Sequence, residues 1–301
     1  MPTLQAAIKA KVDALQNVPI TWADGVMRLQ PTILARMQLL TSQLATDGDG
    51  NLIMDVANLA RVDEIITELA RFLTRSEYVQ LVEGIAEEFT LQQGRTIAYF
   101  EAATGEVPIT TGFAATRYAQ ASDAAIRNIA QNIPTQYLST PLRNTLLEGI
   151  STGSSYRDLL QNVQSIIIGN DVNEGNLLRY SRQIVSDSLS VTDREFTNIV
   201  ANDLGLKWYL YAGGEINTTR CFCDERNGRY YHAEEIKAWG RGEGLGTCAT
   251  KDGWAGMFKG TNESTIFVYA GGYNCQHSLL PVSEAVVPPE DIERAKAKGY
   301  V

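Results

Sequence analysis

The chain has 301 residues, more than one ordinary hydrophobic core uses, and this length predicts about two domains. Acidic residues outnumber basic residues by 35 to 26, and the resulting net charge of −9 disfavours nonspecific wrapping of nucleic acid. The N-terminus lacks the basic start and apolar core of a signal peptide, and no apolar run reaches membrane-spanning length. We therefore expect a soluble protein that stays in the cytoplasm.

The first hundred residues carry apolar side chains spaced three and four positions apart, which predicts helices. One helix is expected at residues 3–16, where Pro19 then interrupts the pattern, and a second at residues 31–44. Two further helices are expected near residues 59–72 and 78–99. This part of the chain is therefore predicted to be all-helical.

The middle of the chain continues in the same style after a glycine- and proline-containing connector at residues 102–112. Helices are expected near residues 114–133 and 141–150. A third, short helix should follow, with Ser154 or Ser155 as its N-cap. These elements extend the helical part well past the midpoint of the chain.

The most regular predicted element is a long helix at residues 176–203. Its apolar residues step by seven, four, seven and four, and they are Leu178, Val185, Leu189, Phe196 and Val200. We expect this stripe to face a core or a partner. Most of the charged residues on the helix are expected to be solvated, and they are Arg179, Arg182, Asp187, Asp193, Arg194 and Glu195.

The residue composition and periodicity of the sequence change after residue 205. Residues 206–211 and 265–269 are rich in aromatic and β-branched side chains and are predicted as strands. One turn of helix is expected at residues 233–239, and a proline linker with a short charged helix at residues 286–294. The predicted fold class is α+β: a mainly helical N-terminal part, then a long helix leading into a small β-rich C-terminal module containing Cys and His.

All the cysteines and histidines lie within residues 220–282, and they are Cys221, Cys223, His232, Cys248, Cys275 and His277. Residues two apart in an extended segment point to one side, so Cys221 with Cys223 and Cys275 with His277 form two pairs of donors. If the pairs face each other, they can surround a structural zinc ion. Two alternatives stay open: a disulfide between Cys223 and Cys275, and reduced thiols packed as small apolar groups.

Three segments together resemble a phage protein family. They are Arg182-Gln183-Ile184 on the long helix, Thr219-Arg220-Cys221-Phe222-Cys223 with Gly228 following, and Asn274-Cys275-Gln276-His277 before Leu280-Pro281-Val282. This order resembles the Mu F-like head-morphogenesis proteins over residues 142–283, about half the chain. The chain departs from the family pattern at the closing element, where Gly272-Tyr273 replaces His-Pro and His277 replaces the last Cys. The spacing of the opening Cys pair is also narrower than is usual in the family.

The resemblance implies a helical docking domain at residues 1–140, a Mu F-like head-morphogenesis domain at 141–285 and a C-terminal tail at 286–301. It implies a minor virion protein that is assembled in the host bacterial cytoplasm and acts in head morphogenesis. Its partners would be the portal or other head and neck proteins, with scaffold as a further candidate, no membrane, and only incidental contact with nucleic acid.

An enzymatic role is not expected, because the sequence has no Ser/His/Asp arrangement and no phosphate-binding glycine loop. The alternative is a zinc-dependent nuclease, or another effector enzyme packaged in the virion, in which His232 or His277 activates water. Such a nuclease also needs a basic surface to approach nucleic acid, and the acidic net charge argues against one.

Overall fold

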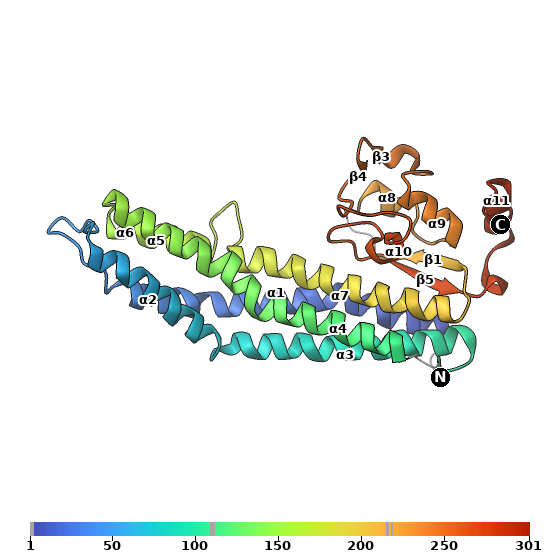
Figure 1. Ribbon diagram of the computed structural model, residues 1–301, viewed down its shortest axis with the longest axis horizontal. Coiled ribbons are helices and arrows are strands. Elements are labelled where there is room, and N and C mark those ends of the chain that lie inside the picture. The colour runs from blue at the N-terminus through green and yellow to red at the C-terminus, as the bar shows by residue number, and fades with distance from the viewer. Residues whose placement is uncertain (1–2, 109–111, 215–216, 218) are drawn as a thin grey trace. The chain divides into compact units, whose positions relative to one another are not determined.

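The computed structural model describes residues 3–108, 112–214, 217 and 219–301. It has the predicted α+β fold, mainly helical, with a small C-terminal region that contains the strands and the Cys and His residues (Figure 1). None of the helices in the described ranges is both long enough and apolar enough to span a bilayer.

The chain divides into two compact units, each built from segments that are distant in sequence. Unit 1 consists of Met1–Val18, Glu88–Asp123 and Ser186–Val301, and unit 2 of Pro19–Glu87 and Ala124–Val185. Four helices contribute residues to both units, namely α1 (Leu4–Thr41), α3 (Glu77–Thr104), α4 (Gly112–Arg127) and α7 (Asn176–Asp203). The sequence predicted a domain boundary between residues 140 and 141, and both residues lie inside unit 2. The predicted division of the chain at that point stays a prediction.

Helix α1 is a single helix and not the two that were predicted, so the expected break at Pro19 is wrong. A proline inside a helix removes one backbone hydrogen bond and costs stability. Burial on both sides of Pro19 offsets this cost, because the apolar stripe continues without a gap. Its fully or almost fully buried members near the proline are Leu15, Val18, Trp22, Val26 and Leu29.

The remaining helices of unit 2 have 5 to 18 residues, and two of them begin at a side-chain cap. They are α2 (Val56–Leu73), η1 (Asn128–Asn132), η2 (Thr135–Ser139), α5 (Thr140–Thr152) and α6 (Tyr156–Ile167). Asp55 accepts a hydrogen bond from the first turn of α2, and Ser155 accepts one from the backbone N–H of Asp158 in α6. The predicted Ser155 cap is therefore confirmed. The predicted connector begins after Thr104, and its residues 109–111 lie outside the described residues.

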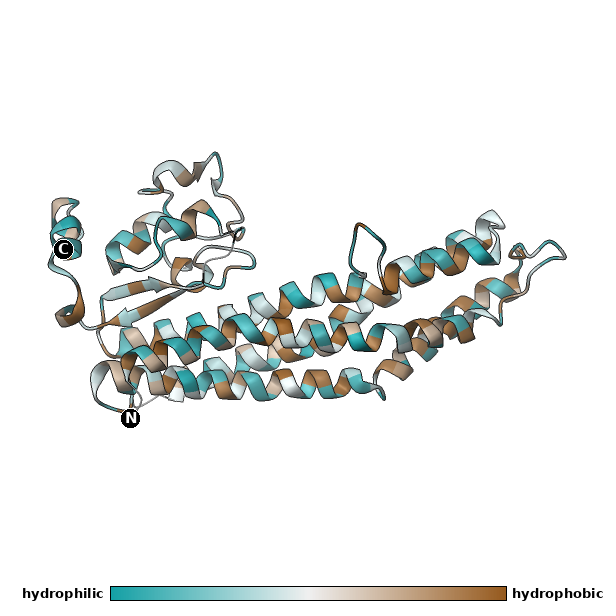
Figure 2. Cartoon of the chain, turned by 180° about the vertical axis from the view of Figure 1, so that it is seen from behind, coloured by the Kyte–Doolittle hydropathy of each residue, from teal (hydrophilic) through white to brown (hydrophobic). Residues whose placement is uncertain are grey.

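Helix α7 has the predicted bounds, and all five members of its predicted apolar stripe are buried. Figure 2 shows apolar and polar residues interleaved along the helices, as expected where one face of each helix is buried. Four of the six charged residues of α7 that were predicted to be mostly solvated are exposed or half-buried, and the two exceptions are Asp193 and Arg194, which are 1% and 2% exposed. Both lie in unit 1, and both contribute to the sites described below.

The C-terminal part of unit 1 is built on an antiparallel sheet in the order β2-β1-β5. Its strands are β1 (Trp208–Ala212), β2 (Arg229–His232) and β5 (Ser278–Val282), with Trp208 opposite both His232 and Val282. A small second ladder joins β3 (Ala249–Thr250) to β4 (Gly253–Trp254). Figure 1 shows α8, α9 and α10 gathered on one side of β1 and β5.

The short helices of this part are α8 (Cys221–Asp224), α9 (Ala233–Gly240), η3 (Gly246–Cys248), α10 (Ile266–Tyr269), η4 (Glu284–Val286) and α11 (Pro289–Ala297). The predicted helices at residues 233–239 and in the C-terminal tail are thus confirmed, as is the strand at 206–211. The predicted strand at 265–269 is wrong. Asn262 accepts hydrogen bonds from the N–H groups of Ser264 and Thr265, and this turn starts α10 instead.

Strand β5 occupies one edge of the sheet, although it contains a proline. Pro281 lies opposite Tyr209 of the central strand. An edge strand tolerates a proline because only one of its two sides takes part in the ladder. All five residues of β5 are nevertheless buried, so the strand contributes core as well as hydrogen bonds.

The tyrosines of this core predict how stability responds to alkaline pH. Burial raises the pKa of Tyr209, which is 2% exposed, from 10 to about 12. The neutral side chain therefore stabilises the fold below pH 10, and this contribution is lost as the pH rises toward 12. Two pKa units correspond to about 2.7 kcal/mol. As the pH rises from 9 to 12, the free energy of unfolding of the wild type should fall by about 2.7 kcal/mol more than that of Tyr209→Phe. Urea unfolding at each pH measures this difference.

The control is Tyr273→Phe, which changes a tyrosine that is 42% exposed. Its unfolding free energy should fall with pH in parallel with that of the wild type. Parallel curves for Tyr209→Phe as well would show that the Tyr209 hydroxyl does not supply this dependence.

Candidate metal centre

Three of the four predicted ligands come together in the C-terminal part of unit 1. Cys223 lies in α8, and Cys275 and His277 lie in the segment that leads into β5. One ligand atom from each of the three residues lies within 4.8 Å of the other two, and all three side chains are buried. The expected fold-back of the first Cys segment onto the last is therefore present for Cys223.

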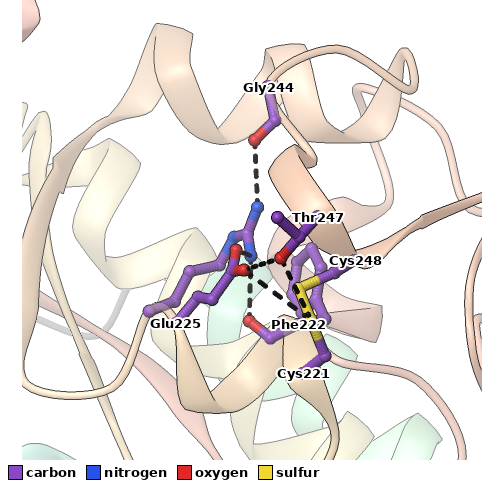
Figure 3. Close-up of a disulfide and its surroundings, with 7 residues drawn as sticks. Cys221, Phe222, Glu225, Gly244, Thr247 and Cys248 are labelled. Atoms are coloured by element: carbon purple, nitrogen blue, oxygen red, sulfur yellow. Dashed lines mark hydrogen bonds and ion pairs between the residues drawn. A yellow bond between two sulfur atoms is a disulfide. The ribbon is translucent and has the colours of Figure 1, made fainter.

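The fourth predicted ligand, Cys221, does not belong to this cluster, because it forms a disulfide with Cys248 (Figure 3). The prediction assumed an extended Cys-x-Cys segment, in which both sulfurs point to one side. The segment is instead a turn of helix, in which residues two apart are rotated by about 200° around the axis. Cys221 and Cys223 consequently face different surroundings.

The spacing of the two free thiols suits a metal ion better than a disulfide. The Sγ atoms of Cys223 and Cys275 are 3.7 Å apart, and both cysteines are free. Two sulfurs bound to a tetrahedral zinc at about 2.3 Å stand roughly 3.8 Å apart, whereas disulfide sulfurs stand about 2.0 Å apart. The cluster, which we call the Cys223 site, can therefore hold a metal with little movement of its sulfurs.

The sequence around the Cys223 site allows an unusually close approach of backbone to sulfur. A Cβ atom on Gly271 would lie 2.4 Å from Cys223 Sγ and 2.7 Å from Cys275 Sγ, inside any permitted contact distance. A Cβ atom on Gly213 would similarly lie 2.5 Å from the His277 ring. Glycine is thus required at both positions by contact, independently of any turn geometry.

Tyr211, on the central strand, connects the donors to one another. Its hydroxyl donates a hydrogen bond of 3.3 Å to Cys223 Sγ and lies 3.9 Å from Cys275 Sγ. Its ring stacks on the His277 imidazole, with centroids 5.4 Å apart. Burial raises the pKa of Tyr211 well above 10, so the hydroxyl keeps its proton and acts as a donor to sulfur.

The polarity of the Cys223 site favours one thiolate. The hydrogen bond from Cys223 lowers the pKa of Cys275, and His277 and Arg194 lower it further. The same hydrogen bond, together with burial, raises the pKa of Cys223. A thiolate is the form of cysteine that binds metals. In addition, Nε2 of His277 is buried and has no hydrogen-bond partner among the described residues. No described protein group therefore binds the lone pair or the proton of this nitrogen.

Arg194 of α7 fixes the backbone that carries two of the donors, and the sequence analysis did not single it out. Its Nε and Nη2 atoms donate to the carbonyl of His277 at 3.0 and 2.7 Å, and Nη2 also donates to the carbonyl of Cys275. Nη1 donates to Val268 at 3.4 Å. The guanidinium thus holds the Cys275–His277 turn in place, in the way that outer residues orient metal ligands.

A second buried group was also missed, and it lies among helices of unit 1. The Lys11 ammonium contacts Asp193 Oδ1 at 2.5 Å and also donates to Thr96 and Thr197. Thr96 and Gln92 donate to the same carboxylate oxygen at 2.7 and 3.1 Å. Burial lowers the pKa of Lys11. One signal was available in the sequence: Asp193 falls in the apolar stripe of α7, four residues after Leu189.

Two other polar side chains in the same part of unit 1 have structural contacts. His232 lies outside the Cys223 site, and its Nδ1 accepts a hydrogen bond from the backbone N–H of Glu234 and caps α9. Arg226 is 4% exposed and stacks over Phe222 and Trp239.

A cavity of about 200 Å³ adjoins the Cys223 site, with Arg220, Asn274 and Gln276 in its wall. Two cysteines and one histidine are donors that metals such as zinc or copper(I) accept in proteins. Comparison of the chain with models of protein families, with curated proteins and with solved structures gave no match in any of the three.

Proposed function

We propose that this chain is a minor structural protein of a tailed-phage head, and that zinc at Cys223, Cys275 and His277 closes its C-terminal module. The helical part would dock on the portal or on another head or neck protein. The phage assignment rests on the Mu F-like order of residues between 142 and 283. The zinc assignment rests on the donor cluster.

The observation that carries the proposal is where the donors come from. Cys223 and Cys275 are 52 residues apart, and the cluster joins the first helix of the module to the segment before its last strand. All three donors are buried, and aromatic Tyr211 packs against them. A metal held by this buried cluster would tie two ends of a small domain together and so stabilise the fold, with a non-protein ligand such as water in its fourth position.

The role in the head can be tested in the phage that encodes the chain. An early stop codon in the gene should give particles that lack the protein and are defective in head assembly, judged by electron microscopy and by infectious titre. Mass spectrometry of purified wild-type heads should find the chain at a few copies per particle. Absence from wild-type heads, together with full infectivity of the stop mutant, would reject the role.

The zinc assignment makes a separate prediction. Purified wild-type protein should contain about one equivalent of zinc, and Cys275→Ser should lose it and unfold at a temperature lower by several degrees. Metal content by mass spectrometry and unfolding by circular dichroism measure the two effects. The matched control is Ser278→Ala, a small buried side chain near the site that supplies no donor to the cluster, which should keep the metal. A zinc-free wild type, with Cys275→Ser as stable as wild type, would exclude the site.

A further inference from the structure

A second group of possible metal ligands surrounds the disulfide. Cys221, Glu225 and Cys248 each place a ligand atom within 4.8 Å of the other two. Figure 3 shows the disulfide with Glu225 and Thr247 beside it. Cys221 is exposed, Glu225 is half-buried and Cys248 is buried, so the group lies at the surface, where water and small thiols can reach it.

The Glu225 carboxylate lies beside the disulfide without a hydrogen bond to it. Its Oε1 atom lies 3.7 Å from Cys221 Sγ, and a disulfide sulfur has no proton to donate. Thr247 donates a hydrogen bond to the same oxygen, while its own hydroxyl lies 3.9 Å from Cys221 Sγ. The other carboxylate oxygen, Oε2, forms an ion pair of 3.8 Å with Arg226. Thr247 and Arg226 thus hold the carboxylate beside both sulfurs, where it can share a cation with them once the disulfide is reduced.

We propose that reduction of the Cys221–Cys248 disulfide creates a second metal site, in which both thiolates and the Glu225 carboxylate bind a divalent ion of the zinc class. Two thiol molecules, R–SH, reduce the disulfide to two cysteine thiols and leave as R–S–S–R. The ion then replaces the two thiol protons, which pass to solvent. Thr247 orients the carboxylate through its hydrogen bond, and surface water completes the coordination.

The two sites are independent because α8 separates their sulfurs. Cys221 supplies the surface site, and Cys223, on another face of the same helical turn, supplies the buried one. The disulfide spans 27 residues, a stretch that contains β2 and α9. A metal held by the same two cysteines closes the same loop, so this part of the chain stays tied in a reducing and in an oxidising environment.

The test compares zinc uptake by the metal-free full chain in two redox states, without oxygen. One sample keeps its disulfide and the other is reduced with an excess of dithiothreitol, which is removed before zinc is added. Bound zinc is counted by native mass spectrometry. The reduced chain should bind about one zinc ion more than the oxidised chain. This difference is expected whether or not the Cys223 site binds zinc, so failure of the proposed function and failure of this inference are distinguishable. Equal uptake in both states would overturn the inference.

Two variants then identify the ligands. Cys248→Ser should abolish the additional zinc, and Glu225→Gln should weaken it at least tenfold while leaving the disulfide of the oxidised form intact. The control Asp224→Asn removes an exposed carboxylate from the neighbouring position and should bind the additional zinc like wild type. Unchanged affinity in Glu225→Gln would remove the carboxylate from the site and overturn the inference as stated.

Discussion

Substitution of Lys11 by methionine is expected to lower the free energy of unfolding by about 3–5 kcal/mol. The ammonium is fully buried and is the cationic partner of Asp193. Without it the carboxylate stays in the core with only the neutral donors Thr96 and Gln92. Its second oxygen, Oδ2, is buried and unpaired among the described residues, so the remaining charge is poorly compensated. Urea unfolding followed by circular dichroism measures the loss.

The control for this prediction is close by on the same helix. Lys9→Met removes an exposed ion pair with Asp13 and should change stability by less than about 1 kcal/mol. The double variant Lys11→Met with Asp193→Leu should recover most of the loss, because removal of both charges leaves no unpaired ion in the core. If Lys11→Met is as stable as Lys9→Met, the ammonium and Asp193 are not paired in the folded protein.

Substitution of Arg194 by methionine is expected to lower the free energy of unfolding by about 4 kcal/mol, because it removes charged donors from buried backbone carbonyls. The carbonyls of Cys275 and His277 receive hydrogen bonds from this guanidinium, and that of Val268 receives a weaker one. The same substitution releases the turn that carries two proposed ligands, so zinc affinity should fall about 10- to 100-fold. Chemical unfolding and competition with a zinc chelator give the two values.

Arg194→Lys is expected to recover only part of the stability and of the zinc affinity that Arg194→Met loses. The reason is that an ammonium cannot reproduce the planar guanidinium, which reaches several carbonyls at once. The control Arg182→Met removes an exposed pair with Glu174 from the same helix and should leave both values near wild type. Normal zinc affinity in Arg194→Met, despite a large loss of stability, would show that Arg194 supports the core without positioning the ligands.

Periodicity was a sufficient guide wherever burial follows one face of one element. Helix α7 has the predicted bounds and buried stripe for this reason. The same reasoning failed at Pro19, where packing along α1 outweighs the local preference of proline, and at residues 265–269, where the Asn262 turn outweighs strand propensity. Local preference is a weak guide when tertiary contacts or a capping side chain oppose it.

The candidate site was predicted in part. That Cys223, Cys275 and His277 meet could be inferred from their types and clustering. That Cys221 faces away could not, because the inference depended on whether four residues form a strand or a turn of helix. Arg194 was missed because its hydrogen-bond partners are backbone carbonyl groups. Every residue has such a group, so the sequence does not indicate which carbonyls need a side-chain donor.

The order of the strands has a consequence for biosynthesis. The central strand β1 pairs on one side with β5. The partner of Trp208 in that ladder is Val282, which the ribosome adds 74 residues later. Until then β1 has an open edge toward that neighbour, a state prone to pairing with other chains. Cys275 and His277 emerge just ahead of β5, so capture of a zinc ion there would bring the missing strand to its place and end this vulnerable interval.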